Sequence, residues 1–156
     1  MPDPSPTFPP PGLPRRLAAL VYDTLLVIPL VGITVALVLL TVAALTGAAE
    51  DDNLVLQPVW VQLIGALCVI GFYTAFWSKG GQTLGMQAWR IQVLDGEGNP
   101  PHPARCVLRC LAALVSLAPA GLGYWWMLVD RERRSWHDRL SGTHLVLLPK
   151  SSRSKS

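Results

Sequence analysis

Residues 24–49 read TLLVIPLVGITVALVLLTVAALTGAA, a stretch of 26 residues without a charged side chain. Residues 53–78 form a second uncharged stretch of 26 residues, and residues 110–129 form a third of 20. A helix needs about 20 apolar residues to cross the hydrocarbon core of a bilayer. Only helices and closed barrels satisfy their backbone groups there, and these continuous runs lack the alternation of barrel strands. The sequence therefore predicts an integral membrane protein of the multi-pass helical class.

The composition also points to a membrane protein. Charged residues make up 15% of the 156 residues, and the mean hydropathy is +0.37, whereas about a quarter of a soluble domain is charged. The first apolar run is too long for a cleaved signal peptide, whose apolar core has about 7–15 residues, so we expect a retained helix. Three cysteines in or beside apolar segments suit a reducing setting better than a disulfide framework.

The chain divides into a membrane domain between two tails. Residues 1–14 contain seven prolines, which is typical of a disordered tail, and residues 149–156 are predicted to be a disordered basic tail. Residues 15–148 are predicted to form one membrane domain. Its helices are expected at about residues 17–45, 59–77 and 106–129.

A short pair of strands is expected between and after the apolar runs. Residues 89–95, WRIQVLD, alternate apolar and polar side chains and end at a Gly- and Pro-rich turn, a pattern that predicts a strand. Residues 143–148 form a similar run. Two isolated strands are marginal separately, so we expect them to pair with each other.

The positions of Lys and Arg predict the orientation in the membrane. Two arginines precede the first apolar run, none lies in the acidic loop at residues 50–52, and Lys79, Arg90 and Arg105 follow the second run. We therefore predict that the N-terminus, the middle segment and the strand pair are cytoplasmic. The membrane that we predict is the inner (cytoplasmic) membrane of a bacterium.

The third apolar run is interrupted by residues 118–123, APAGLG, which would break a straight helix. A full crossing would also export the seven cations of the C-terminal segment, against the orientation rule. We favour a re-entrant element and keep a full crossing as the alternative. The predicted fold is an all-α integral membrane protein with two transmembrane helices, a broken third apolar element and a short cytoplasmic β-strand pair.

Asp23 is the first candidate functional residue. It follows Arg16 by seven positions, two helical turns along the same face. A carboxylate inside the apolar zone costs about 2.5–3.5 kcal/mol, so it should face a partner cation or a wet cavity. Two interpretations stay open: Asp23 binds an exchangeable proton or cation, or it forms a fixed ion pair that holds the helices together.

A charged segment around Trp136 is the second candidate. Arginine stems can lie on apolar surface while their heads reach lipid phosphates, which predicts contacts with a bilayer that contains anionic lipids. The predicted lipid and interface residues are Arg131, Arg133, Arg134, Trp136 and Arg139. Asp138 is unexpected on an anionic surface, so we expect it to pair with an arginine such as Arg16 or Arg109.

Three blocks in the chain resemble the RDD family of bacterial membrane proteins, which is named for one arginine and two aspartates. The blocks are residues 16–23 (RLAALVYD), residues 81–86 (GQTLGM) with 95–98 (DGEG), and residues 137–143 (HDRLSGT). Arg16, Asp23 and Asp138 match the three name-giving residues, and the resemblance extends from about Arg15 to Leu147. It implies a candidate role in transport, because a few members are reported as sodium/proton antiporters.

Other chemistry is not indicated. His102, Cys106 and Cys110 would lie on one helix face, but Pro103 and the missing fourth ligand favour packing over a soft-metal site. No phosphate loop, Ser/His/Asp set or zinc-hydrolase pattern is present. We therefore predict no enzyme, catalytic residue, metal or cofactor, and we attribute the net charge of +3 to membrane topology rather than to nucleic-acid binding.

The leading functional hypothesis is a transport-associated inner-membrane protein that moves a monovalent cation or proton through Asp23. The alternative is a non-transporting structural or accessory module that binds lipids and partner proteins. Two full helices cannot enclose a pore, so transport would require a homo-oligomer or partner membrane subunits.

Overall fold

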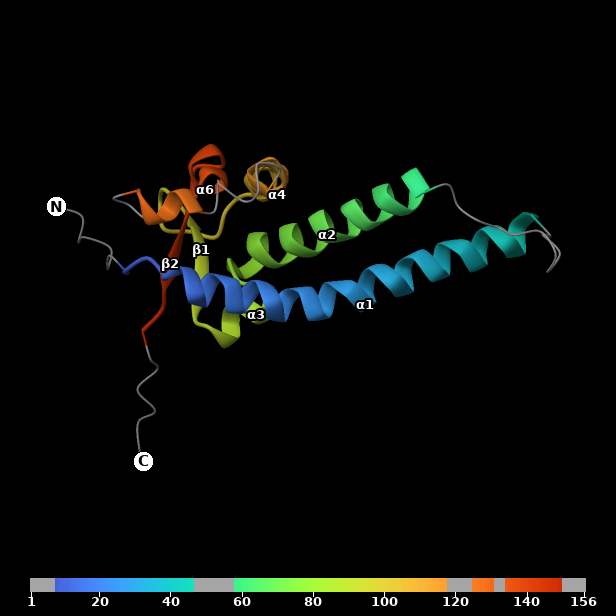
Figure 1. Ribbon diagram of the computed structural model, residues 1–156, viewed down its shortest axis with the longest axis horizontal. Coiled ribbons are helices and arrows are strands. Elements are labelled where there is room, and N and C mark those ends of the chain that lie inside the picture. Colours follow the sequence, from blue (N-terminus) through green and yellow to red (C-terminus); the bar gives the residue numbers. More distant parts are fainter. Residues whose placement is uncertain (1–7, 47–57, 118–124, 131–133, 150–156) are drawn as a thin grey trace, which may run out of the picture. The chain divides into compact units, whose positions relative to one another are not determined.

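The computed structural model describes residues 8–46, 58–117, 125–130 and 134–149 (Figure 1). In chain order the elements are α1 (Leu13–Thr46), α2 (Pro58–Gly80), α3 (Leu84–Ala88), β1 (Ile91–Asp95), α4 (Pro103–Leu117), the 3-10 helix η1 (Trp126–Leu128), α6 (Trp136–Leu140) and β2 (Thr143–Leu147). Several sequence predictions concern residues outside the described part, namely half of the N-terminal tail, most of the C-terminal tail, the acidic loop at 50–52, the interruption at 118–123, Arg131 and Arg133.

Helices α1 and α2 are long and apolar enough to cross a membrane, and none of their most apolar residues is buried inside the protein. Apolar side chains that face outward along a whole helix suit lipid rather than water. Two polar side chains in the apolar part of α1 are satisfied by the helix itself, since the hydroxyls of Thr34 and Thr41 donate to carbonyls four residues earlier. The structure is therefore mostly helical, as predicted, with two candidate membrane-spanning helices.

The helix bounds differ from the expected ones. Helix α1 begins at Leu13, four residues before the predicted start, and Pro29 lies within it. Helix α4 begins at Pro103 and ends at Leu117. Proline suits the first turn of a helix, because a backbone N–H at that position would have no partner within the helix. The third predicted helix, at 106–129, is therefore represented by α4 and the separate turn η1 in the described residues.

The contacts divide the chain into two compact units. The terminal unit comprises Met1–Asp23 and Tyr73–Ser156, and the apolar unit comprises Thr24–Phe72. In the apolar unit, α1 and α2 approach each other at Gly65, where a Cβ would lie 3.5 Å from Val31 Cγ1. The terminal unit contains both strands, the short helices, the first turns of α1 and the last turns of α2.

Strands β1 and β2 form an antiparallel pair in the terminal unit, which confirms the predicted pairing. The register places Ile91 opposite Leu147 and Asp95 opposite Thr143. Ile91 and Val93 are fully buried, so the apolar residues of the alternating pattern form the core. The backbone N–H of Leu147 donates to the carbonyl of Pro9 at 2.9 Å, so part of the Pro-rich segment lies along β2.

Candidate functional site

Asp138 lies at the start of α6, where the local sequence fixes its position. Residues 135–138, SWHD, form a capping box. The Ser135 side chain accepts from the helix backbone, and the Ser135 backbone N–H donates to Asp138 Oδ2 at 3.0 Å. A serine followed three residues later by an acidic residue is typical of a helix start, so the short helix aims the carboxylate inward.

Two arginines from distant parts of the chain meet this carboxylate. Arg16 Nη1 of α1 lies 2.9 Å from Asp138 Oδ2, and Arg109 Nη2 of α4 lies 2.6 Å from Oδ1. The side chains of Arg16, Arg109 and Asp138 are 8%, 3% and 0% exposed. A buried charge is tolerated when it is paired and hydrogen-bonded. Asp138 therefore joins α1, α4 and α6 through one buried ion-pair network.

Arg109 has further partners beside the carboxylate. Its Nη1 donates to Thr143 Oγ1 at 2.5 Å, and that hydroxyl lies 2.7 Å from Ser141 Oγ. Its guanidinium carbon lies 5.1 Å from the centre of the Trp77 ring, within cation–π range. We define the Asp138 cluster as Arg16, Arg109, Ser135, Asp138 and Thr143. Its contacts tie α2 and β2 to the other three elements.

The charge state of the cluster follows from its surroundings. Burial alone would raise the pKa of Asp138, but the guanidinium groups of Arg109 and Arg16 hold that pKa well below its usual range. Burial lowers the pKa of His137 to about 3, and the positive charge of Arg109 acts in the same direction. Near neutral pH, Asp138 is therefore ionised, and the neighbouring His137 is neutral. His137 Nε2 lies 2.9 Å from Ser135 Oγ.

This neutral histidine predicts a loss of stability in mild acid. The folded-state pKa of His137 lies below its ordinary value of 6.5, so the unfolded chain binds the proton first as the pH falls. The stability is complete above pH 6.5 and declines toward pH 3. Between pH 7 and pH 5 we expect His137 to account for a loss of about 2 kcal/mol. Thermal unfolding in detergent at both pH values measures it, with His137→Gln as the comparison. Equal pH dependence in the two proteins would contradict this assignment.

Asp23 forms a second cluster, in which the partners are neutral. Its side chain is buried, at 2% exposure. Asp23 Oδ2 accepts from the Thr83 hydroxyl at 2.5 Å, and Oδ1 accepts from the Gly85 backbone N–H at 2.9 Å. Thr83 is the N-cap of α3, and its hydroxyl accepts from Met86 N–H at 3.2 Å. We call Asp23, Thr83 and Gly85 the Asp23 cluster, which joins α1 to the start of α3.

Gly85 allows this close contact. A Cβ at this position would lie 2.8 Å from Asp23 Oδ1 and would also meet the Ala19 carbonyl oxygen. Because glycine has no side chain, the backbone N–H of Gly85 can reach the carboxylate directly. We had expected Asp23 to face a cation or a wet cavity. Among the described residues it has no ion pair, and a hydroxyl and a backbone amide take that place.

The comparison with known proteins supports the resemblance seen in the sequence. A model of the RDD family matches residues 10–142, which is most of the chain. The chain belongs to the RDD family. The matched range includes Arg16, Asp23 and Asp138. No curated protein and no solved structure matches this chain.

In this RDD-family protein the three name-giving residues do not meet at one point. The sequence places Arg16 and Asp23 on one helix face and predicts that Asp138 pairs with an arginine such as Arg16 or Arg109, and the structure pairs Asp138 with both arginines. Sequence reasoning assigned no role to Thr83, Gly85 or Thr143. One sign of a role was present in the sequence, because all three residues lie in the blocks that resemble the RDD family.

The structure describes three of the predicted lipid contacts, namely Arg134, Trp136 and Arg139. Arg139 Nη2 lies 2.5 Å from Asp130 Oδ1, and the Arg139 side chain is 51% exposed. The Arg134 backbone N–H donates to Asp130 Oδ2 at 2.9 Å. The Trp136 ring lies 6.0 Å from the Trp126 ring.

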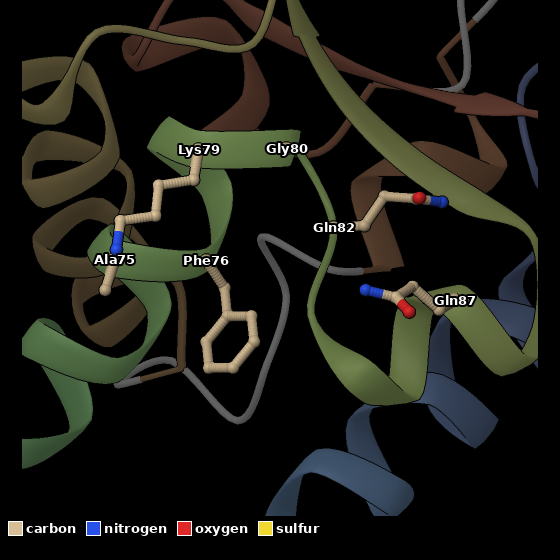
Figure 2. A pocket seen from close by; sticks show the side chains of 6 residues that line it. All are labelled: Ala75, Phe76, Lys79, Gly80, Gln82 and Gln87. Carbon is tan, nitrogen blue, oxygen red and sulfur yellow. The ribbon is translucent and has the colours of Figure 1, made fainter.

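A hollow of about 350 Å³ lies elsewhere in the terminal unit of the RDD-family protein. Figure 2 shows Phe76 and Lys79 on one side of it and Gln82 and Gln87 on the other. The Gln82 amide is already engaged, because its Nε2 donates to the Ile91 carbonyl at 2.7 Å. None of the predicted site residues lines this hollow.

Proposed function

We propose that this RDD-family protein is a non-transporting membrane module, which anchors a small folded unit and binds lipids and partner proteins. The observation that carries the proposal is the buried Asp138 carboxylate between Arg16 and Arg109. Ion exchange needs a charge that gives up its partner and reaches water. Here both carboxylate oxygens face fixed guanidinium groups on other elements, an arrangement suited to holding a fold together.

The second candidate is transport of a monovalent cation or proton through Asp23. It is favoured by one observation, the buried carboxylate whose described partners are all neutral. An acid inside a membrane segment is by default a functional candidate. Since two spanning helices cannot enclose a pore, this role requires a homo-oligomer or partner membrane subunits.

Ion flux separates the two functions. Purified protein in liposomes, with sodium- and proton-sensitive dyes inside, is compared with Asp23→Asn protein and with empty liposomes. We expect all three preparations to show the same flux under sodium and pH gradients. Wild-type flux above the empty liposomes, lost in a well-folded Asp23→Asn protein, would overturn the proposal in favour of transport.

The hydrogen bonds of Asp23 predict how two substitutions differ. Asn keeps an oxygen that accepts from Gly85 N–H, and its amide can donate to Thr83, so Asp23→Asn should cost less than about 1 kcal/mol. Asp23→Ala leaves both donors without their acceptor and should cost about 1–3 kcal/mol. Thermal melts in detergent compare the pair. Equal, severe destabilisation by both substitutions would mean that Asp23 needs its charge for folding.

The proposal includes the inner membrane of a bacterium, with the N-terminus in the cytoplasm. It rests on the cations before the first helix and after the second, and on the acidic loop between the helices. In intact cells, an impermeant thiol reagent should label Asp52→Cys and spare Ser154→Cys, in a Cys68→Ala background. Labelling of Ser154→Cys from outside would mean that the C-terminal end of the chain lies outside the cytoplasm. The partners in this proposal are anionic lipids and either a second copy or other membrane subunits.

A further inference from the structure

Helix α4 buries two polar side chains and exposes several large apolar ones. Its buried face includes Arg109 and Ser116, at 3% and 1% exposure. Its outer face carries four large apolar residues that are 46–64% exposed, namely Leu108, Leu111, Leu114 and Val115. We call these four residues the α4 stripe. A surface helix in water has the opposite pattern.

The buried face of α4 is the one that the protein itself covers. Helix α6 packs against α4, and Arg109 reaches Asp138 from this side. Large side chains at spacings of three and four residues, such as 108, 111 and 115, share the other face of the helix. The stripe is therefore a continuous apolar strip that the described part of the chain leaves open.

The contact between Arg109 and Trp77 sets the level of α4 along α2. The guanidinium carbon lies 5.1 Å from the centre of the Trp77 ring, and Trp77 is three residues before the end of α2 at Gly80. The Tyr73 ring lies 4.9 Å from the same tryptophan. The exposed Lys79 ends the uncharged run in the last turn of α2, and the charged end of a spanning helix lies at the level of the lipid headgroups. Helix α4 therefore contacts α2 at the membrane interface.

The direction and length of α4 exclude a full crossing by this helix. Figure 1 shows α4 end-on, whereas the last turns of α2, in the same unit, run across the view. Helix α4 is thus strongly inclined to these last turns of α2. Its 15 residues extend about 22 Å, less than the roughly 30 Å of hydrocarbon.

We infer that α4 lies in the plane of the membrane interface, with the α4 stripe inserted among the upper acyl chains of the bilayer lipids. Arg105 is exposed one turn before Leu108 on the same side of the helix, where its guanidinium can reach lipid phosphate. The inference goes beyond the proposed function, since it holds whether or not the chain carries ions.

Lipid fits this strip better than a protein partner does. A stable protein interface buries about 800 Å² on each side, much more than four half-exposed side chains offer. The α4 stripe also lies at a level where lipid surrounds the chain, and the positive charge of Arg105 complements the negative charge of the phosphates. A second copy of the chain remains an outcome that the experiment distinguishes.

The test uses an environment-sensitive dye on single cysteines. Cys106 and Cys110 are buried, and burial raises the pKa of the Cys110 thiol to about 11, so only Cys68 is replaced by alanine. The dye is placed at Leu111→Cys and Leu114→Cys, with Asn99→Cys in the exposed turn before α4 as the matched control. The protein is reconstituted in phosphatidylcholine and phosphatidylglycerol vesicles, with and without brominated acyl chains.

We expect blue-shifted emission and strong quenching by brominated chains at 111 and 114, and emission typical of water without quenching at 99. Water-like emission at 111 and 114 would overturn the inference. Blue-shifted emission that resists quenching and depends on the protein-to-lipid ratio would assign the stripe to a second copy and also overturn it. If the cysteine variants fold poorly, a membrane-dissolved photoreactive carbene applied to the unsubstituted protein gives the same answer. It should modify residues 108–115 and leave residues 96–99 unmodified, and the reverse result would contradict the inference.

Discussion

Asp138→Asn is expected to be the most damaging single substitution in this protein. Asparagine fits the space but removes the charge that Arg16 and Arg109 share, and both guanidinium groups are at least 92% buried. Breaking a buried ion pair by removing one partner costs about 3–5 kcal/mol. We expect little folded protein after detergent extraction, and a strongly lowered melting temperature in what remains.

The matched control is Arg139→Gln. Arg139 lies on the same short helix as Asp138, and the substitution breaks its ion pair with Asp130. The Arg139 side chain is 51% exposed, and exposed ion pairs contribute about 0–1 kcal/mol. Melting temperatures of the two variants in one detergent give the comparison. If Asp138→Asn melts within a few degrees of Arg139→Gln, the Asp138 cluster does not stabilise the fold.

Gly85→Ala is expected to have the second largest effect. The new methyl group would lie 2.8 Å from Asp23 Oδ1 and against the Ala19 carbonyl, so α3 must move away from α1. Overpacking and the loss of the Gly85–Asp23 hydrogen bond together should cost about 2–4 kcal/mol. The melting temperature and the yield of folded protein both report this loss.

Gly71→Ala provides the control for the same chemical change. Gly71 lies within α2, and a Cβ there meets nothing within 4 Å. Alanine in an open helical position stabilises by roughly 0.5–1 kcal/mol, so this variant should melt at or slightly above the wild-type temperature. If Gly85→Ala also melts at the wild-type temperature, the close approach of α3 to Asp23 does not exist in solution.

The helices and the strand pair could be predicted from the sequence because each has a local cause. Uncharged runs of 26 residues cannot be kept in water, and the alternation in residues 89–95 has the period of a strand. The two strands were expected to pair because neither is stable alone, and the antiparallel register of β1 and β2 provides that partner. The bounds of α4 were less predictable, because the apolar run continues past Leu117, where the helix ends.

The partners of the buried charges could only be predicted in part. The spacing of Arg16 and Asp23 is a one-dimensional signal, and it suggested a shared face. The pairing of Asp138 with an arginine was expected because a carboxylate is out of place on an anionic surface, but no periodicity encodes the 122 positions that separate it from Arg16. Asp23 was expected to face a cation or a wet cavity, whereas glycine at position 85 lets a backbone amide donate to its carboxylate. Such neutral partners leave no charge pattern in a sequence.

A double-mutant cycle on Arg109 and Asp138 tests the central claim, that a closed ion-pair network holds the terminal unit together. Arg109→Gln, Asp138→Asn and the double variant are unfolded in detergent beside the wild type. Arg109 also contacts Thr143 and Trp77, but the cycle cancels losses that do not depend on Asp138. We predict that the double variant is more stable than the sum of the two single losses implies, by at least about 2 kcal/mol. Losses that add to within about 0.5 kcal/mol would contradict the account, because groups that do not interact behave in that way.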